Sequence, residues 1–165
     1  MVEGLLTQLD EHSSLHGVKV IVTLNFGEKF IIRSYGNITI FIIRNSSPKG
    51  FGANHNKAFE YCATQWFGVL NPDLRLKEEE PFTKLLELYQ SNAKSIGAIA
   101  PRIINERGNI EDSIRSNLTP WSLIMRQLFG RRKSINFDQQ QNTKDFFWLA
   151  GMCLLLNSKA FESIK

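Results

Sequence analysis

An apolar run that ends in an acidic turn constrains the fold of this chain more than any other feature. Residues 66–70 are followed by Asn71, Pro72 and Asp73. Upstream, residues 50–59 have the composition of a glycine-rich turn that opens a helix. A strand that ends in such a turn delivers a carboxylate to the edge of a sheet, where open α/β sheets bind ligands. The order of glycine turn, helix, strand and acidic turn predicts a site for a diphosphate and its metal ion.

Strand-like and helix-like segments alternate along the rest of the chain. Helical spacing of apolar residues predicts helices over 3–12, from Asn54 as N-cap to about residue 64, from Pro81 through Tyr89, and over 158–164. Apolar runs, several of them β-branched, predict strands over 18–22, 38–43, 66–70, 96–100 and 146–156. This alternation predicts the α/β class: a three-layer α/β/α sandwich with a mostly parallel sheet, in a single domain over residues 1–165.

Composition narrows the possible partners. The 165 residues are 42% hydrophobic, with a net charge of +4, a balance that suits anionic ligands or a membrane surface. No charge run is long enough for a nucleic-acid arm, so we expect no nucleic-acid partner. Cys62 and Cys153 lack metal-ligand spacing and are expected to be reduced. No signal peptide and no apolar run near the ~20 residues needed to span a bilayer is present, so we expect a cytoplasmic protein.

The glycine turn and the acidic turn together resemble the family 2 glycosyltransferases, especially the rhamnosyltransferase-like branch. The resemblance continues in family order over residues 18–164. Residues 99–103 look like the next strand, 112–120 like the arginine segment, and 148–156 like the late strand that lines the acceptor site. The resemblance implies a GT-A-like fold and an inverting enzyme. Such enzymes transfer a sugar from a nucleotide-diphosphate donor to a glycan or lipid-linked acceptor in surface polysaccharide synthesis.

The acidic turn is the predicted metal site. Members of this family usually carry Asp-x-Asp or Asn-x-Asp here, and Asn71 and Asp73 match the second form. A divalent cation held by oxygen ligands, Mg²⁺ or Mn²⁺, would neutralise the charge that develops on the departing diphosphate. The alternative is an ordinary Asn-Pro-Asp turn that ends a strand.

Further residues complete the predicted site. Gly50 and Gly52 would let the backbone approach a nucleotide, or would only let a loop pass close to the sheet. Gly151 would leave room for an acceptor sugar, or would only allow close packing. Arg115 would balance the diphosphate, or would be a solvated loop arginine. The predicted nucleotide-sugar site comprises Asn25, Gly50, Gly52, Asn54, Asn56, Asn71, Asp73 and Arg115, with Gly151 at the acceptor.

The chain departs from the family pattern at both ends. No strand ending in a nucleotide-binding turn precedes residue 18, and Leu24 stands where the family has a base-binding aspartate. The usual catalytic base would lie beyond Lys165, so no catalytic residue is assigned and the domain is expected to be truncated at both ends. The alternatives are a catalytically incomplete remnant that binds nucleotide sugars, and a nucleotidyltransferase.

Two segments predict contacts with partners. Strand 18–24 would lack its neighbour on one side, so we expect a homodimer formed by pairing of this strand, unless residues 30–33 fold back as a substitute. Residues 121–129 have apolar side chains at helical spacing and are followed by Arg131, Arg132 and Lys133. This segment would lie against the inner face of the plasma membrane, or would be a core-packed helix with a solvated basic end.

Overall fold

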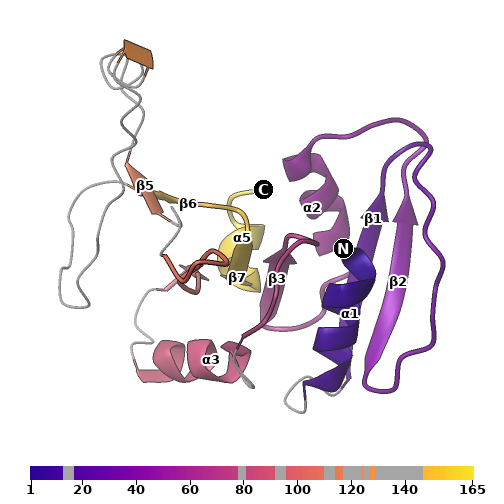
Figure 1. The fold of residues 1–165 in the computed structure, drawn as a ribbon, viewed down its shortest axis with the longest axis horizontal. Helices are drawn as coiled ribbons and strands as arrows, with labels where there is room; N and C mark the ends of the chain where they lie inside the picture. The colour runs from indigo at the N-terminus through magenta and orange to yellow at the C-terminus, as the bar shows by residue number, and fades with distance from the viewer. Residues whose placement is uncertain are drawn as a thin grey trace.

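The computed structural model describes residues 1–12, 17–77, 81–91, 96–109, 114–116, 124, 127–128 and 147–165. Strands and helices alternate from Ile38 to Ile99, as the sequence predicts, whereas the strands Val18–Leu24 and Ile38–Arg44 follow each other with no helix between them (Figure 1). The elements are α1 (Val2–Glu11), β1 (Val18–Leu24), β2 (Ile38–Arg44), α2 (Phe51–Phe59), β3 (Trp66–Leu70), α3 (Pro81–Ser91), β4 (Ala98–Ile99), β5 (Ile114–Ser116), β6 (Phe147–Leu149), β7 (Cys153–Asn157) and α5 (Ser158–Glu162).

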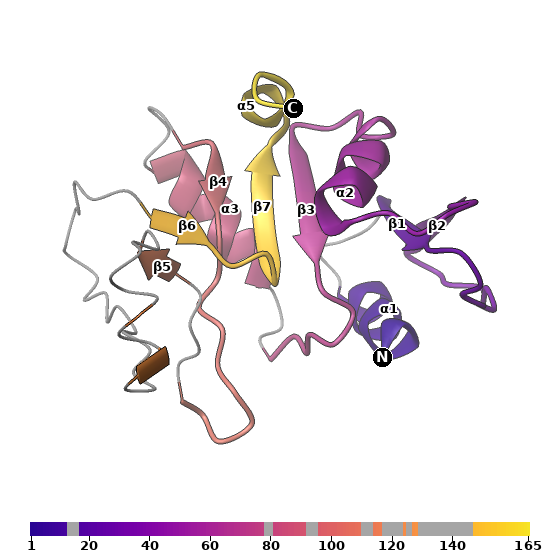
Figure 2. The ribbon, with the colours of Figure 1, turned by 90° about the horizontal axis from the view of Figure 1, so that it is seen from above.

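The strands form three groups. β1 and β2 pair in parallel, from Val18 opposite Ile38 to Leu24 opposite Arg44. β7 lies between β3 and β4 and is antiparallel to both, as Figure 2 shows. β5 and β6 form a separate antiparallel pair. Since β3 and β4 both oppose β7, they run in the same direction.

The predicted α/β class is confirmed, and the pairing is more mixed than the mostly parallel sheet expected. Direct parallel pairing among the described strands is confined to β1 and β2. β3 and β4 keep one direction because α3 lies between them in the chain, as in a parallel crossover. The reversed strand β7 then enters between them from a distant part of the chain and supplies hydrogen bonds to both.

Two buried clusters show that helices cover both faces. On one face, α1 and α3 pack on Val22 and Leu24 of β1 and on Cys153 and Leu155 of β7. On the other face, side chains of α2 and α5 pack with Phe67 and Val69 of β3 and with alternate residues of β7. Alternation of side chains along each strand sends neighbouring residues to opposite clusters. This confirms the three-layer α/β/α arrangement.

Several segments differ from the sequence-based expectation. The strand expected over 146–156 is two strands, β6 and β7, separated by a turn at residues 150–152. The strand expected over 96–100 is only Ala98–Ile99. Helix α2 begins at Phe51, with Gly50 rather than Asn54 as N-cap. Residues 30–33 form neither helix nor strand. Most of the 121–133 segment lies outside the described residues.

An aspartate on α1 ties the first helix to the start of β2. The Asp10 carboxylate accepts hydrogen bonds from the backbone N–H groups of Asn37 (2.7 Å), Gly36 (3.1 Å) and Ile38 (3.1 Å). The Asp10 pKa is lowered, and the bond from Asn37 is the largest cause. Desolvation of the carboxylate raises the pKa, whereas the bonds from Gly36 and Ile38 lower it further. The charged carboxylate is therefore the form that the folded chain favours.

We expect the Asp10→Asn variant to melt at a lower temperature than the parent chain at neutral pH. Because folding lowers the Asp10 pKa, its stabilisation is complete above the ordinary value of 3.8 and is lost as the pH falls through the folded-state pKa. Melting curves between pH 7 and pH 2 would therefore converge at the acid end. Glu11→Gln, an exposed neighbour on the same helix, is the matched control, and a difference that persists in acid would contradict the assignment.

Candidate functional site

Three asparagines join the ends of β1 and β2 to the start of α2. Asn45 Nδ2 donates to Asn25 Oδ1 (3.1 Å) and to Asn54 Oδ1 (2.8 Å). Asn25 Oδ1 also accepts from the backbone N–H of Lys49 (3.1 Å). The structure thus brings together two predicted residues, Asn25 and Asn54, through a third that the motif analysis did not select.

The strand register explains the position of Asn45. Leu24 lies opposite Arg44, so Asn25 and Asn45 each follow the end of one strand of the parallel pair. The backbone N–H of Asn45 donates to the carbonyl of Leu24 (2.9 Å), which keeps the two chains together there. The sequence signal that could have identified Asn45 is that it and Asn25 each come shortly after a predicted strand. The carboxamide oxygens of Asn25 and Asn54 accept hydrogen bonds from Asn45 and from the backbone of Lys49. These bonds hold the loop before α2 against the ends of β1 and β2.

Helix α2 presents an open first turn. Gly50 is its N-cap, in an extended conformation. A methyl group built on Gly50 or Gly52 would meet no heavy atom within 4 Å in the described part of the chain, so packing there does not explain either glycine. Asn56 is exposed and follows Gly52 by one helical turn, so the two share a face. The first N–H groups of a helix lack intrahelical partners and carry partial positive charge, which favours anions.

The acidic turn is anchored at the edge of the β3–β7 pair. The backbone N–H of Asn71 donates to the carbonyl of Met152 (2.9 Å), and Leu74 N–H donates to the carbonyl of Asn71 (3.2 Å). Asp73 is exposed and Asn71 is half-buried. No group of three His, Cys, Asp or Glu residues that could enclose a metal ion occurs among the residues described. One carboxylate and one amide match the sparse protein ligation of Mg²⁺, which takes its other ligands from water and phosphates.

Gly151 lies against an aromatic ring from α2. A methyl group built on Gly151 would lie 2.9 Å from Cζ and 3.2 Å from Cε1 of Phe51. Phe51 also contacts His55 edge-on, with ring centroids 4.2 Å apart, and burial lowers the pKa of His55. The space expected over Gly151 for a sugar is therefore taken, at least in part, by the Phe51 ring. Gly151 is in the turn between β6 and β7, and the next residue, Met152, accepts the hydrogen bond from Asn71. This turn therefore connects the start of α2 with the acidic turn.

Two further sequence expectations concern Arg115 and Leu24. Arg115 lies on β5, with its backbone opposite Trp148 of β6, so it belongs to the strand pair that leads into the Gly151 turn. Leu24 is only 7% exposed and packs in the core beneath α1. A buried leucine offers no hydrogen bond to a nucleobase, so any base recognition must come from other residues.

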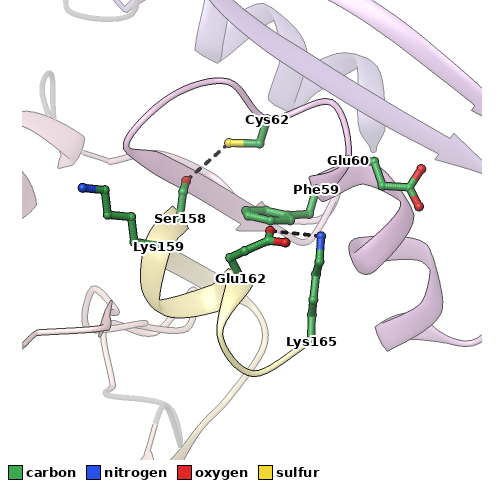
Figure 3. Close-up of a pocket in the computed structure, with 7 residues that line it drawn as sticks. All are labelled: Phe59, Glu60, Cys62, Ser158, Lys159, Glu162 and Lys165. Atoms are coloured by element: carbon green, nitrogen blue, oxygen red, sulfur yellow. Dashed lines mark hydrogen bonds and ion pairs between the residues drawn. The ribbon is translucent and has the colours of Figure 1, made fainter.

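A separate pocket of about 440 Å³ lies at the opposite end of α2, beside α5 (Figure 3). Two of its charged groups form an ion pair, in which Lys165 Nζ lies 3.0 Å from Glu162 Oε2. The Cys62 thiol contacts the Ser158 hydroxyl at 3.4 Å. Burial raises the pKa of Cys62, but hydrogen bonds with Ser158 and Thr64 outweigh it and the net shift is downward. The lining residues are Phe59, Glu60, Cys62, Ser158, Lys159, Glu162 and Lys165, and none of them was predicted as a site residue.

The comparisons with known proteins agree with the geometry. A model of glycosyl transferase family 2 matches residues 27–163, which include Asn45 and Asn54 of the asparagine network, the start of α2, the acidic turn and the Gly151 turn. No curated protein and no solved structure matches the chain. The family match covers most of the chain and carries with it the GT-A-like fold of nucleotide-sugar transferases. The chain therefore belongs to glycosyl transferase family 2.

Proposed function

We propose that this chain transfers a sugar from a nucleotide-diphosphate donor to a glycan or a lipid-linked acceptor. One observation supports this above the others: the open glycine turn of α2 and the acidic turn after β3 meet at the same edge of the fold. The contact of Phe51 with Gly151 and the 2.9 Å hydrogen bond from Asn71 to Met152 connect them. One side offers backbone N–H groups to an anion, and the other offers oxygen ligands to a cation.

The diphosphate would lie against the first turn of α2. Gly50 and Gly52 open into space, so a ligand can approach the backbone closely there. The first N–H groups of that turn, which have no partner within the helix, favour negatively charged oxygens. Asn56, exposed on the same face as Gly52, can donate and accept hydrogen bonds to the ribose or the base. Arg115 would balance the remaining negative charge.

The acidic turn would hold Mg²⁺ or Mn²⁺. Asp73 supplies a carboxylate and Asn71 an amide oxygen, both of the oxygen type that these ions prefer. The backbone of Asn71 is fixed by Met152, so the turn is organised before any ligand arrives. When bound, the ion would act as a Lewis acid that neutralises the charge on the departing nucleoside diphosphate.

A second candidate is a domain that binds nucleotide sugars without transferring them. The buried position of Leu24 favours it, because the family's usual base contact is missing there. The internal hydrogen bonds of Asn25 and Asn54 favour it too, since their oxygens are already engaged.

Calorimetry with a panel of nucleotide sugars in Mn²⁺, followed by product analysis, tests the proposal. Binding with release of the nucleoside diphosphate to an added glycan or lipid-linked acceptor is the expected result. Binding without turnover would support the second candidate, and release of pyrophosphate would support a nucleotidyltransferase. A chain that binds no member of the panel, nor its parent diphosphate, would contradict the proposed function.

We propose in addition that β1 pairs with the same strand of a second copy. In the described part of the chain β1 is paired with β2 alone, and β3 with β7 alone. An unpaired strand edge presents backbone groups that another chain can bind. Light scattering at micromolar concentration should therefore give the mass of a dimer. A monomer whose amides over residues 18–24 are protected from hydrogen exchange would contradict this pairing.

A further inference from the structure

We propose that Phe51 is a platform on which the apolar face of a sugar ring stacks. This rests on the proposed function, which it deepens by naming the residue that binds the sugar. Phe51 is 56% exposed although it is a large apolar side chain. It is also the first residue of α2, at the edge where the candidate site lies.

The ring of Phe51 is held in place by its neighbours. The Cζ end of the ring lies against Gly151, so close that a Cβ there would be 2.9 Å from Cζ. The His55 ring contacts it at an interplanar angle of 69°. A side chain held from two sides loses little further freedom when a ligand binds, which favours affinity.

The chemistry of an exposed aromatic face suits a carbohydrate. Its π-system carries negative charge on the face, which attracts the weakly positive C–H groups on one side of a pyranose ring. Burial of the exposed part of the Phe51 ring against those C–H groups also removes apolar surface from water. The hydroxyl groups of the sugar, which project around its edge, stay free to bind polar partners.

The position of Phe51 fits a sugar attached to the diphosphate. The ring touches the Gly151 turn, Met152 follows Gly151, and the carbonyl of Met152 holds Asn71 at 2.9 Å. The platform is therefore connected through one turn to the predicted metal ligands. The same platform could receive the donor sugar or the acceptor sugar, since both present pyranose faces.

Calorimetry tests the platform with UDP-glucose, UDP-N-acetylglucosamine and dTDP-rhamnose, each compared with its parent diphosphate in Mn²⁺. We expect Phe51→Ala to reduce the affinity gained from the sugar by about tenfold, the scale of an aromatic contact, and to leave the affinity for the diphosphate unchanged. Phe51→Tyr should preserve the gain. Gly151→Ala should reduce it with Phe51 intact, because the added methyl must displace the ring. Phe41→Ala, which removes a partly exposed phenylalanine that contacts Tyr61, is the matched control.

Saturation-transfer NMR with methyl glucoside and methyl rhamnoside identifies the source of the sugar. Loss of the methyl glycoside signal in Phe51→Ala, with nucleotide-sugar affinity unchanged, would place the acceptor on the platform; the converse would place the donor there. An unchanged sugar contribution in both measurements would overturn the proposal, as would an equal loss of affinity for the bare diphosphate. Failure of the parent chain to bind any diphosphate would contradict the proposed function instead, and the methyl glycoside titration would still decide the role of Phe51.

Discussion

The Asp73→Asn variant should lose about three orders of magnitude in kcat while keeping its fold. The change keeps the shape of the side chain and removes the negative charge that would hold the divalent cation. Lewis-acid stabilisation of a departing diphosphate is worth several kcal/mol, and ~1.4 kcal/mol corresponds to tenfold in rate. Because Asp73 is exposed, the variant should unfold within about 0.5 kcal/mol of the parent.

Thermal melting gives a readout for Asp73 that does not depend on turnover. A ligand at about a hundred times its Kd stabilises a protein by ~2.7 kcal/mol, or roughly 5–10 °C for a chain of this size. The parent chain should show this rise with a nucleoside diphosphate and Mn²⁺ together, and Asp73→Asn should lose the part that requires Mn²⁺. Glu87→Gln, an exposed carboxylate on α3, is the control. The same Mn²⁺-dependent rise in both variants would show that the ion binds elsewhere.

Leu6→Ala should give the largest loss of stability among single truncations in the first helix. Leu6 is 2% exposed and belongs to the cluster in which α1 packs with β1, β2, α3 and β7. Removing a fully buried leucine side chain costs about 2–5 kcal/mol, because transfer energy is lost and a cavity remains. Urea unfolding should therefore show a lower midpoint with an unchanged slope.

The matched truncation for Leu6 is Ile31→Ala. Ile31 is 77% exposed in the segment between β1 and β2, so the same kind of change there removes little burial and should shift the free energy of unfolding by less than about 0.5 kcal/mol. Equal effects of the two variants would mean that α1 does not pack on the sheet as described. A loss of stability in Leu6→Ala alone would support the packing of α1 on this face of the sheet.

The sequence predicted those elements whose side-chain pattern is local. The spacing of Leu5, Leu6 and Leu9 marks α1, and the β-branched run of residues 18–22 marks β1, because burial on one face or on both leaves a repeating pattern. The break at Gly151 could not be predicted in this way. Residues 146–156 are apolar on both faces, so periodicity gives no sign that β6 and β7 belong to different sheets.

The candidate site was predictable residue by residue, but its internal contacts were not. Motif order identified Asn54 and Gly50, yet it suggested Asn54 as a helix cap, whereas its carboxamide accepts a bond from Asn45. That bond depends on the register of β1 against β2, which no local pattern contains. The same holds for Phe51 and Gly151, which are far apart in the chain and meet only because β7 lies between β3 and β4.

The central position of β7 has a consequence for the order in which the protein can form during synthesis. The chain leaves the ribosome from its N-terminus, so β3 and β4 emerge long before β7, which lies between them and pairs with both. Contacts between segments so distant in the chain form slowly. The turn at Asn71 also forms late, because its backbone N–H donates to the carbonyl of Met152, which is synthesised much later. The nascent chain must therefore carry an unfinished sheet, with β3 and β4 unpaired, until β7 (Cys153–Asn157) appears, and the Asn71 turn is among the last parts to take shape.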